Sequence, residues 1–132
     1  MASRDDIFGT VQTAVVDALG VDEDEVTPEA TLLDELGAES IDLLDILFRL
    51  ERKLGVKIQA ADLAAYVQGG IADDDFGDEN GIITERGLAH LKTVMPQINE
   101  SELRGSFQAE KVMSLFTVDN LTDLVMSRVG AS

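Results

Sequence analysis

The sequence predicts an all-α fold, and three observations favour this class. Apolar residues recur at helical spacing, as in the first segment, where one face carries Ile7, Val11, Ala14, Val15 and Ala18. Glycine or proline follows such segments where a helix is expected to end, as at Gly20 and Pro96. The spacing from Asn99 to Glu102 is that of a capping box at a helix start.

The expected elements follow in chain order from the same signals. Helices are predicted over residues 5–19, 60–66, 84–95, 99–104 and 117–129. Another is predicted to open within residues 37–42, to run through about Arg52 and to stop near Gly55, and residues 56–58 look extended. Residues 69–81 are rich in Gly and Asp and are expected to form a loop. Leu32, Leu33 and Leu36 predict that residues 29–37 are an ordered connector packed on the core.

The composition indicates one domain over residues 1–132. Apolar residues make up 45% of the chain, which is enough for a single buried core. Ten Lys and Arg against 26 Asp and Glu give a net charge of −16. Such a surface repels phosphate backbones and anionic lipid, so it argues against nucleic-acid binding and membrane association and favours basic protein partners. The same charge argues against tight self-association, so a monomer is expected.

Residue types that are missing or rare exclude further classes. The chain has no cysteine, which excludes disulfides, thiolate metal sites and cysteine nucleophiles, and one histidine, His90, which is too few for a multi-histidine metal site. No stretch approaches the roughly 20 apolar residues of a membrane span. The first residues carry no apolar signal core, so the cytoplasm is the expected location. Most enzyme classes are thereby removed.

The helix predicted between Gly37 and Gly55 carries two apolar stripes. One lies within an arc of roughly 100° and contains Leu43, Ile46, Leu47, Leu50 and Leu54. Ile41, Leu44 and Phe48 form the second, with Asp45 beside it. Either the rest of the chain buries both stripes, or the second is exposed and docks a partner. The positions of these residues on a helical wheel favour neither alternative.

The segment before and into this helix, Asp34-Glu35-Leu36-Gly37-Ala38-Glu39-Ser40-Ile41-Asp42, resembles an acyl carrier protein. Residues 25–33, 43–58 and 116–121 are similar to the loop after the first helix, to the second helix with its following segment, and to the start of the last helix. The resemblance implies a four-helix bundle of the acyl-carrier type. It also implies a carrier rather than an enzyme.

The resemblance implies that Ser40 attaches 4′-phosphopantetheine, whose thiol then carries acyl groups as thioesters. A phosphate at a helix N-terminus meets unpaired backbone N–H groups and the positive end of the helix dipole. The alternative for Ser40 is a plain helix-capping serine. The implied partners are a phosphopantetheinyl transferase, synthases and acyltransferases with basic docking patches, and the acyl chain itself.

The resemblance also implies that partner enzymes dock on this helix, at the positions that correspond to the family's docking residues. The positions concerned are four acids and two apolar residues: Glu39, Asp42, Asp45, Glu51, Ile41 and Phe48. Two features depart from the family pattern. Glu39 stands where the family usually has Asp, a change expected to preserve function. Arg49, Arg52 and Lys53 stand where many carriers are acidic, which suggests a dedicated set of partners.

Residues of roughly 66–114 are extra relative to a typical carrier and form an insertion between its third and fourth helices. Their apolar residues recur with partial helical spacing. The layout, and residues 84–96 in particular, resemble the enlarged long-chain acyl carriers of lipid A assembly. That resemblance implies a very long or hydroxylated acyl cargo, whose groove the insertion would extend or cover. The alternative is that the inserted helices only enlarge the core or bind a protein.

The same residues leave other functions to consider, of which two keep the carrier fold. A free-standing polyketide or aminoacyl carrier differs only in its cargo, and a carrier-fold scaffold would dock through Ile41, Leu44 and Phe48 without a prosthetic group. Residues 78–83 resemble half of a calcium-binding loop but lack two of the necessary carboxylates, so no metal site is expected. His90 is expected to be structural. A catalytic triad would have to use this one histidine, so a hydrolase is the least favoured of the functions considered.

Overall fold

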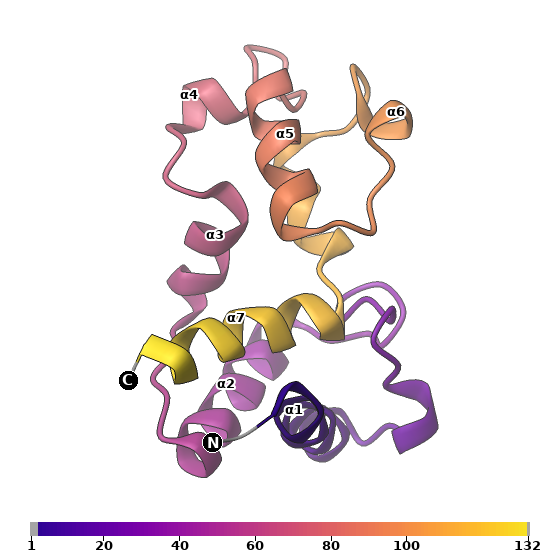
Figure 1. Cartoon of the computed structure of the whole chain (residues 1–132). Coiled ribbons are helices and arrows are strands. Elements are labelled where there is room, and N and C mark those ends of the chain that lie inside the picture. The colour runs from indigo at the N-terminus through magenta and orange to yellow at the C-terminus, as the bar shows by residue number, and fades with distance from the viewer. Residues whose placement is uncertain (1–2, 132) are drawn as a thin grey trace. The chain divides into compact units, whose positions relative to one another are not determined.

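The computed structural model describes residues 3–131, apart from the side chains of Ser40, Ala60 and Ala131 (Figure 1). Its elements in order are α1 (Arg4–Leu19), the 3₁₀ helix η1 (Glu23–Glu25), α2 (Ser40–Leu54), α3 (Ala60–Gln68), α4 (Asp73–Phe76), α5 (Glu85–Val94), α6 (Glu100–Leu103), the 3₁₀ helix η2 (Ala109–Leu115) and α7 (Val118–Ala131). Only isolated bridges, and no β-strand, occur among these residues, which confirms the all-α class.

The described chain divides into two compact units. One combines the residues up to Ala60 with those from Phe116 onward, and the other is Ala61–Leu115. The second unit begins before residue 66, where the insertion was expected to begin, so most of α3 belongs with the insertion. That residues 1–132 form a single domain stays a prediction.

In the first unit α1 packs against both α2 and α7 (Figure 1). The apolar faces of these helices bury each other, and the fully buried side chains include Ile7, Val11, Val15, Ile46, Leu50, Leu121, Leu124 and Val125. A capping box starts α1, in which the Asp6 N–H donates to Ser3 Oγ (3.2 Å) and the Ser3 N–H donates to Asp6 Oδ2 (3.3 Å). Gly20 ends the helix with φ of 71°, as the sequence predicted.

The first and last helices are also joined by charge. Arg4 forms ion pairs with Asp119 and, at 2.7 Å from Nη1 to Oδ1, with Asp123. Partial burial raises the pKa of the Asp123 carboxyl, and the Arg4 guanidinium opposes this shift. Arg4 thus fixes the start of α1 beside the first half of α7.

The connector before α2 is ordered by backbone pairing, which confirms the expectation from its leucines. The Leu32 N–H donates to the Phe116 carbonyl (3.1 Å), and the Val118 N–H donates to the Ala30 carbonyl (3.0 Å). Leu32 is buried, and Leu33 and Leu36 are half-buried. These bonds tie the connector to the start of α7 and so fix the approach of the chain to α2.

The second unit has an apolar core of its own. Within it α5 contacts α4 and α6, and the buried side chains include Leu63, Val67, Phe76, Ile83, Leu88, Leu91, Met95 and Ile98. Backbone bonds close its loops, among them the Ile83 N–H to the Phe107 carbonyl (2.8 Å). The insertion is therefore a packed structure and not a polar linker.

Two elements of the second unit were not predicted. The expected loop over residues 69–81 contains α4, because three aspartates suit the first turn of a helix and Phe76 is buried at its end. The other is η2, which has no buried residue and no strong helical periodicity. Their formation depends on contacts within the insertion, which the local sequence of either segment does not reveal.

Gly87 gives a test of packing in the insertion. A Cβ at this position would lie 2.8 Å from the Phe76 carbonyl oxygen and 2.9 Å from Phe76 Cδ1. We expect Gly87→Ala to lower the free energy of unfolding by about 1–3 kcal/mol, because backbone and ring must move to admit the methyl group. Urea unfolding and amide hydrogen exchange of the second unit measure this loss of stability.

The matched control is Gly9→Ala in α1, where a Cβ would meet no atom within 4 Å. There the alanine is expected to be neutral or to stabilise by up to about 1 kcal/mol, through its higher helix propensity. Equal stability of the two variants would contradict the close packing described for Gly87.

Candidate functional site

The start of α2 holds the candidate attachment residue. Ser40 is the first helical residue and Glu39 is the N-cap, so the helix begins one residue earlier than it would if Ser40 were the cap. The Glu39 N–H donates to Asp42 Oδ2 (2.9 Å), and the Leu43 N–H donates to the Glu39 carbonyl (3.0 Å). The side chain of Ser40 lies outside the described part of the structure.

The backbone leading to Ser40 is held by three features. Gly37 has φ of 72°, a left-handed conformation that favours glycine, and it turns the chain toward α2. Ala38 is buried and its N–H donates to the Leu32 carbonyl (2.8 Å). The next residue, Glu39, is exposed. Ser40 therefore follows a fixed connector at a point where the chain emerges at the surface.

This position suits a phosphate ester. The first N–H groups of a helix have no partner within the helix, and the dipole of the 15-residue α2 places partial positive charge there. Ile41 is 70% exposed, so the first turn is open to an enzyme that would modify it. The residues present thus fit a phosphodiester-linked arm on Ser40.

One face of α2 is apolar and open to solvent. Ile41, Leu44 and Phe48 are 70%, 53% and 57% exposed, whereas Ile46, Leu47 and Leu50 on the other face are buried. The reading in which the chain buries both stripes is therefore wrong. We call Ile41, Leu44 and Phe48 the exposed stripe. Three large apolar side chains at i, i+3 and i+7 are typical of a helix face that binds a partner.

The charges around the exposed stripe are of both signs. Asp45 Oδ1 lies 3.0 Å from Arg49 Nε, and the Arg52 guanidinium lies 5.7 Å from the centre of the Phe48 ring. Asp42 caps the helix, Glu39 is exposed and Glu51 is half-buried. The i, i+4 spacing of Asp45 and Arg49 is the signal in the sequence from which this ion pair could have been found.

The other residues that the sequence singled out lie in structural roles. A His90 ring nitrogen lies 3.2 Å from the Tyr66 carbonyl oxygen, and a Cβ at Gly69 would meet the His90 ring at 2.2 Å. Asp78 Oδ1 accepts from the N–H groups of Asn80 (2.8 Å) and Ile82 (3.0 Å), which makes the half-loop a turn closed on itself.

Residues 3–131 contain neither a metal-binding group of side chains nor a helix that could cross a membrane. No three His, Cys, Asp or Glu side chains in this part of the chain are grouped so that they could hold a metal ion. None of the helices described there has the length and apolar character needed to span a bilayer.

Comparison with known proteins places the site in context. A family model described as a phosphopantetheine attachment site matches residues 9–68, a range that includes Ser40 and the whole of α2. The chain is 51% identical over 63 residues to an acyl carrier protein of Thermotoga maritima, which is 48% of this chain and 78% of that protein.

Two further relatives carry the same name. An acyl carrier protein of Petrotoga mobilis is 41% identical over 61 residues, covering 46% of this chain and 72% of that protein. One of Rubrobacter xylanophilus is 44% identical over 55 residues, covering 42% of this chain and 68% of that protein. All three matches leave more than half of this chain unmatched.

Proposed function

Because the chain belongs to the acyl carrier protein family, we propose that Ser40 holds its prosthetic group and that the loaded chain delivers an acyl group between biosynthetic enzymes. Members of this family are carriers and not enzymes, and the prosthetic group is 4′-phosphopantetheine. When bound, that group supplies the thiol on which an acyl chain is held as a thioester. The chain itself has no cysteine.

The observation that carries the assignment of Ser40 is its position. It is the first residue of α2, it follows the backbone turn at Gly37, and Ile41 beside it is 70% exposed. The helix N-terminus stabilises the phosphate of the arm through its N–H groups and dipole. The Asp42 carboxylate already binds the Glu39 N–H, so it holds the first turn in place rather than meeting the phosphate.

We propose that α2 is the docking helix for the transferase that installs the arm and for the enzymes that load and unload it. The exposed stripe supplies apolar contact, and Glu39, Asp42, Asp45 and Glu51 supply negative charge to basic patches on those enzymes. Arg49 pairs with Asp45, so a partner that uses Asp45 must compete with Arg49 for it. This supports the expectation of a dedicated set of partners.

Phe48→Ser tests the docking role of the exposed stripe. We expect kcat/KM for arm transfer by a phosphopantetheinyl transferase to fall about tenfold, because aromatic residues at the centre of an interface contribute most to binding. The unfolding midpoint should change little, since the Phe48 side chain is already 57% exposed. A kcat/KM within twofold of the unmodified chain would remove Phe48 from the docking surface.

The nature of the cargo is the finer part of the proposal. We propose a long or hydroxylated fatty acyl chain, destined for a product of the lipopolysaccharide type, handled in the cytoplasm by acyl synthases and acyltransferases. The support is the similarity of residues 84–96 to the enlarged carriers of lipid A assembly, together with an insertion that has its own packed core.

The deciding experiment is the intact mass of the chain purified from its own cells, followed by release and identification of the thioester-bound acid. A long or hydroxylated fatty acid supports the cargo. A polyketide or aminoacyl group would keep the carrier and replace the cargo. A chain that stays unmodified, both in cells and after incubation with coenzyme A and its own transferase, would favour a scaffold that docks without the arm.

A further inference from the structure

The basic residues of the chain are concentrated at the end of α2. Four of the ten Lys and Arg lie within residues 49–57, against one acid in that stretch. Residues 22–45, which lead into the helix and form its first part, hold ten acids and no Lys or Arg. The exposed stripe therefore runs from an acidic start of α2 toward a basic end.

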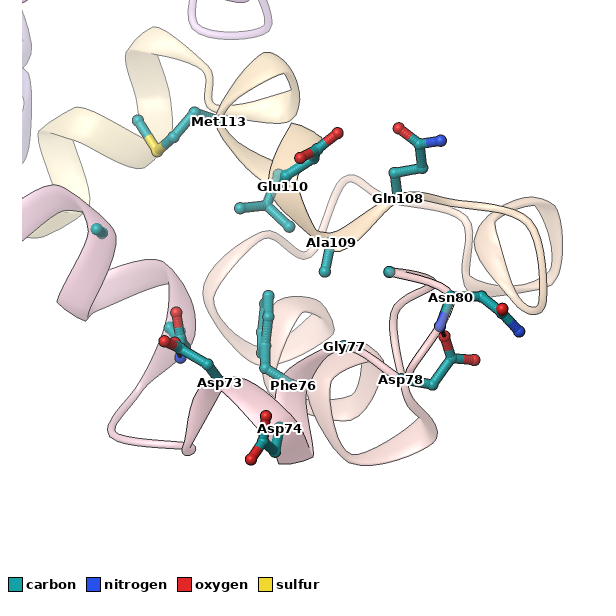
Figure 2. Close-up of a pocket in the computed structure, with 14 residues that line it drawn as sticks. Asp73, Asp74, Phe76, Gly77, Asp78, Asn80, Gln108, Ala109, Glu110 and Met113 are labelled. Carbon is teal, nitrogen blue, oxygen red and sulfur yellow. Dashed lines mark hydrogen bonds between the residues drawn. The ribbon is translucent and has the colours of Figure 1, made fainter.

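This basic end is a local exception on an acidic chain. A groove of about 600 Å³ within the second unit shows the more usual surface, since its lining includes Asp73, Asp74, Asp78 and Glu110 and no Lys, Arg or His (Figure 2). Such acids follow from the net charge of −16 and by themselves select no ligand. Four cations within nine residues do not follow from that charge and need a local reason.

The helix dipole explains these cations only in part. Arg52 and Lys53 lie in the last turn of α2, where positive charge is stabilised. Arg49 pairs with Asp45, and Lys57 lies beyond the helix. The dipole acts on a charge at any face of the last turn, so it does not explain why Arg52 lies on the face of the exposed stripe.

Arg52 continues the line of the exposed stripe by one turn. It follows Phe48 by four residues, which places both on one side of the helix, and its guanidinium lies 5.7 Å from the centre of the Phe48 ring. Arg52 and Lys53 are both exposed. Among residues 3–131 neither of them has a carboxylate within ion-pair distance. A surface that covers Phe48 must therefore also meet the Arg52 guanidinium.

The charge of Arg52 determines the chemistry of that surface. A partner that is basic along the whole of α2 would bring like charge against Arg52 beside an apolar contact, where water screens it least. A carboxylate would instead bind the planar guanidinium through two parallel hydrogen bonds. A small anion would satisfy the charge and leave Phe48 uncovered, so the apolar neighbour favours a protein that presents an Asp or Glu.

We propose that the transferase that installs the arm covers α2 with a surface divided like the helix itself, in which basic groups face Glu39 and Asp42 and a carboxylate faces Arg52. The proposal rests on the proposed docking role of α2 and adds the chemistry of the partner. The transferase is the partner concerned because it must reach the start of α2 whatever the cargo. Arg52 lies 12 residues after Ser40, or about 18 Å along the helix. An interface of standard size, about 800 Å² on each side, extends over that distance.

The test is arm transfer from coenzyme A by the chain's own transferase, measured as kcat/KM at low and at high salt. Arg52→Glu should lower kcat/KM about tenfold at low salt, because attraction becomes repulsion at the same point. The deficit should shrink at high salt, where exposed charges are screened, whereas a defect in the helix would persist. Urea unfolding of both chains checks that α2 is intact.

The matched control is Lys111→Glu on η2, an exposed cation of the second unit whose replacement changes the net charge equally. Its kcat/KM should stay within about twofold of that of the unmodified chain, because charges farther apart than the Debye length are largely screened.

Three outcomes would overturn the proposal. An equal or higher kcat/KM for Arg52→Glu would mean that the transferase presents no carboxylate there. Equal losses in Arg52→Glu and Lys111→Glu would mean that the enzyme senses only net charge. Sedimentation that rises with concentration in the unmodified chain, and not in Arg52→Glu, would assign the surface to a second copy, whose own α2 start supplies the acids.

These outcomes are distinct from a failure of the proposed function. All three are read from chains that receive the arm or from sedimentation, and they leave attachment at Ser40 in place. If the proposed function failed, the unmodified chain would gain no arm, and the division of charge on the transferase would be overturned with it.

Discussion

Ser40→Ala is expected to abolish attachment of the arm completely, because no other hydroxyl shares its position at the start of α2 after the connector turn. The unmodified chain, incubated with coenzyme A and a phosphopantetheinyl transferase, should gain the mass of one phosphopantetheine, and the variant should gain none. The proposed assignment predicts an absolute rather than a graded loss, since it places the phosphodiester bond on the oxygen that the variant lacks. Intact-mass spectrometry measures both species in one spectrum.

Two controls make this result specific. Ser101→Ala removes an exposed serine near the start of α6 and should leave loading unchanged. Glu39→Asp restores the residue that the family usually has before the serine and should load at least as well as the unmodified chain. A full mass gain by Ser40→Ala would contradict the assignment of the site, while the family membership would stand.

Phe116→Ala is expected to have the largest effect on stability. Phe116 is fully buried beside the start of α7, and its carbonyl accepts the N–H of Leu32 from the connector. Removing its ring would leave a cavity in the first unit and lower the free energy of unfolding by about 3–5 kcal/mol. Because a domain of this size is stable by only about 5–15 kcal/mol, urea unfolding should show a large fall in the midpoint.

Phe48→Ala removes the same atoms from an exposed position and is the matched control. With a ring that is 57% exposed, the loss should stay below about 1 kcal/mol. If the two variants lost similar stability, the burial described for Phe116 would be wrong. The pair also separates the two roles of phenylalanine in this chain, since only Phe48 is expected to affect docking.

The carrier helices could be predicted well from the sequence, and α2 shows why. Its apolar periodicity, the acidic residues at its start and Gly55 at its end are local signals, and the structure places the helix at Ser40–Leu54 with Gly55 in the left-handed conformation. By contrast, α4 and η2 were missed. The short helix α4 ends at Phe76, whose side chain is buried within the insertion. One buried residue in a Gly- and Asp-rich segment gives no helical periodicity from which a helix could be predicted.

The candidate site was predictable in position but not in exposure. The motif around Ser40 places it at a helix start, which the structure confirms for the backbone. Whether Ile41, Leu44 and Phe48 face solvent could not follow from a helical wheel, because their burial depends on which face of α2 is covered by α1 and the rest of the first unit. Once α1 packs on the other face, the exposed stripe remains open.

The first unit is built from two stretches of the chain that are separated by the insertion, and this arrangement limits the order in which the units can fold. Its core needs Leu121, Leu124 and Val125 of α7, and these residues are synthesised after the whole of Ala61–Leu115. The core of the first unit can therefore close on α1 only when α7 is available, after the residues of the insertion have been synthesised. The insertion adds little to the free energy of closing the chain between α2 and α7, since each doubling of the length of a closed loop adds only about 0.6 kcal/mol. The packed first unit, including the fixed approach to α2, therefore forms only after the insertion has been made.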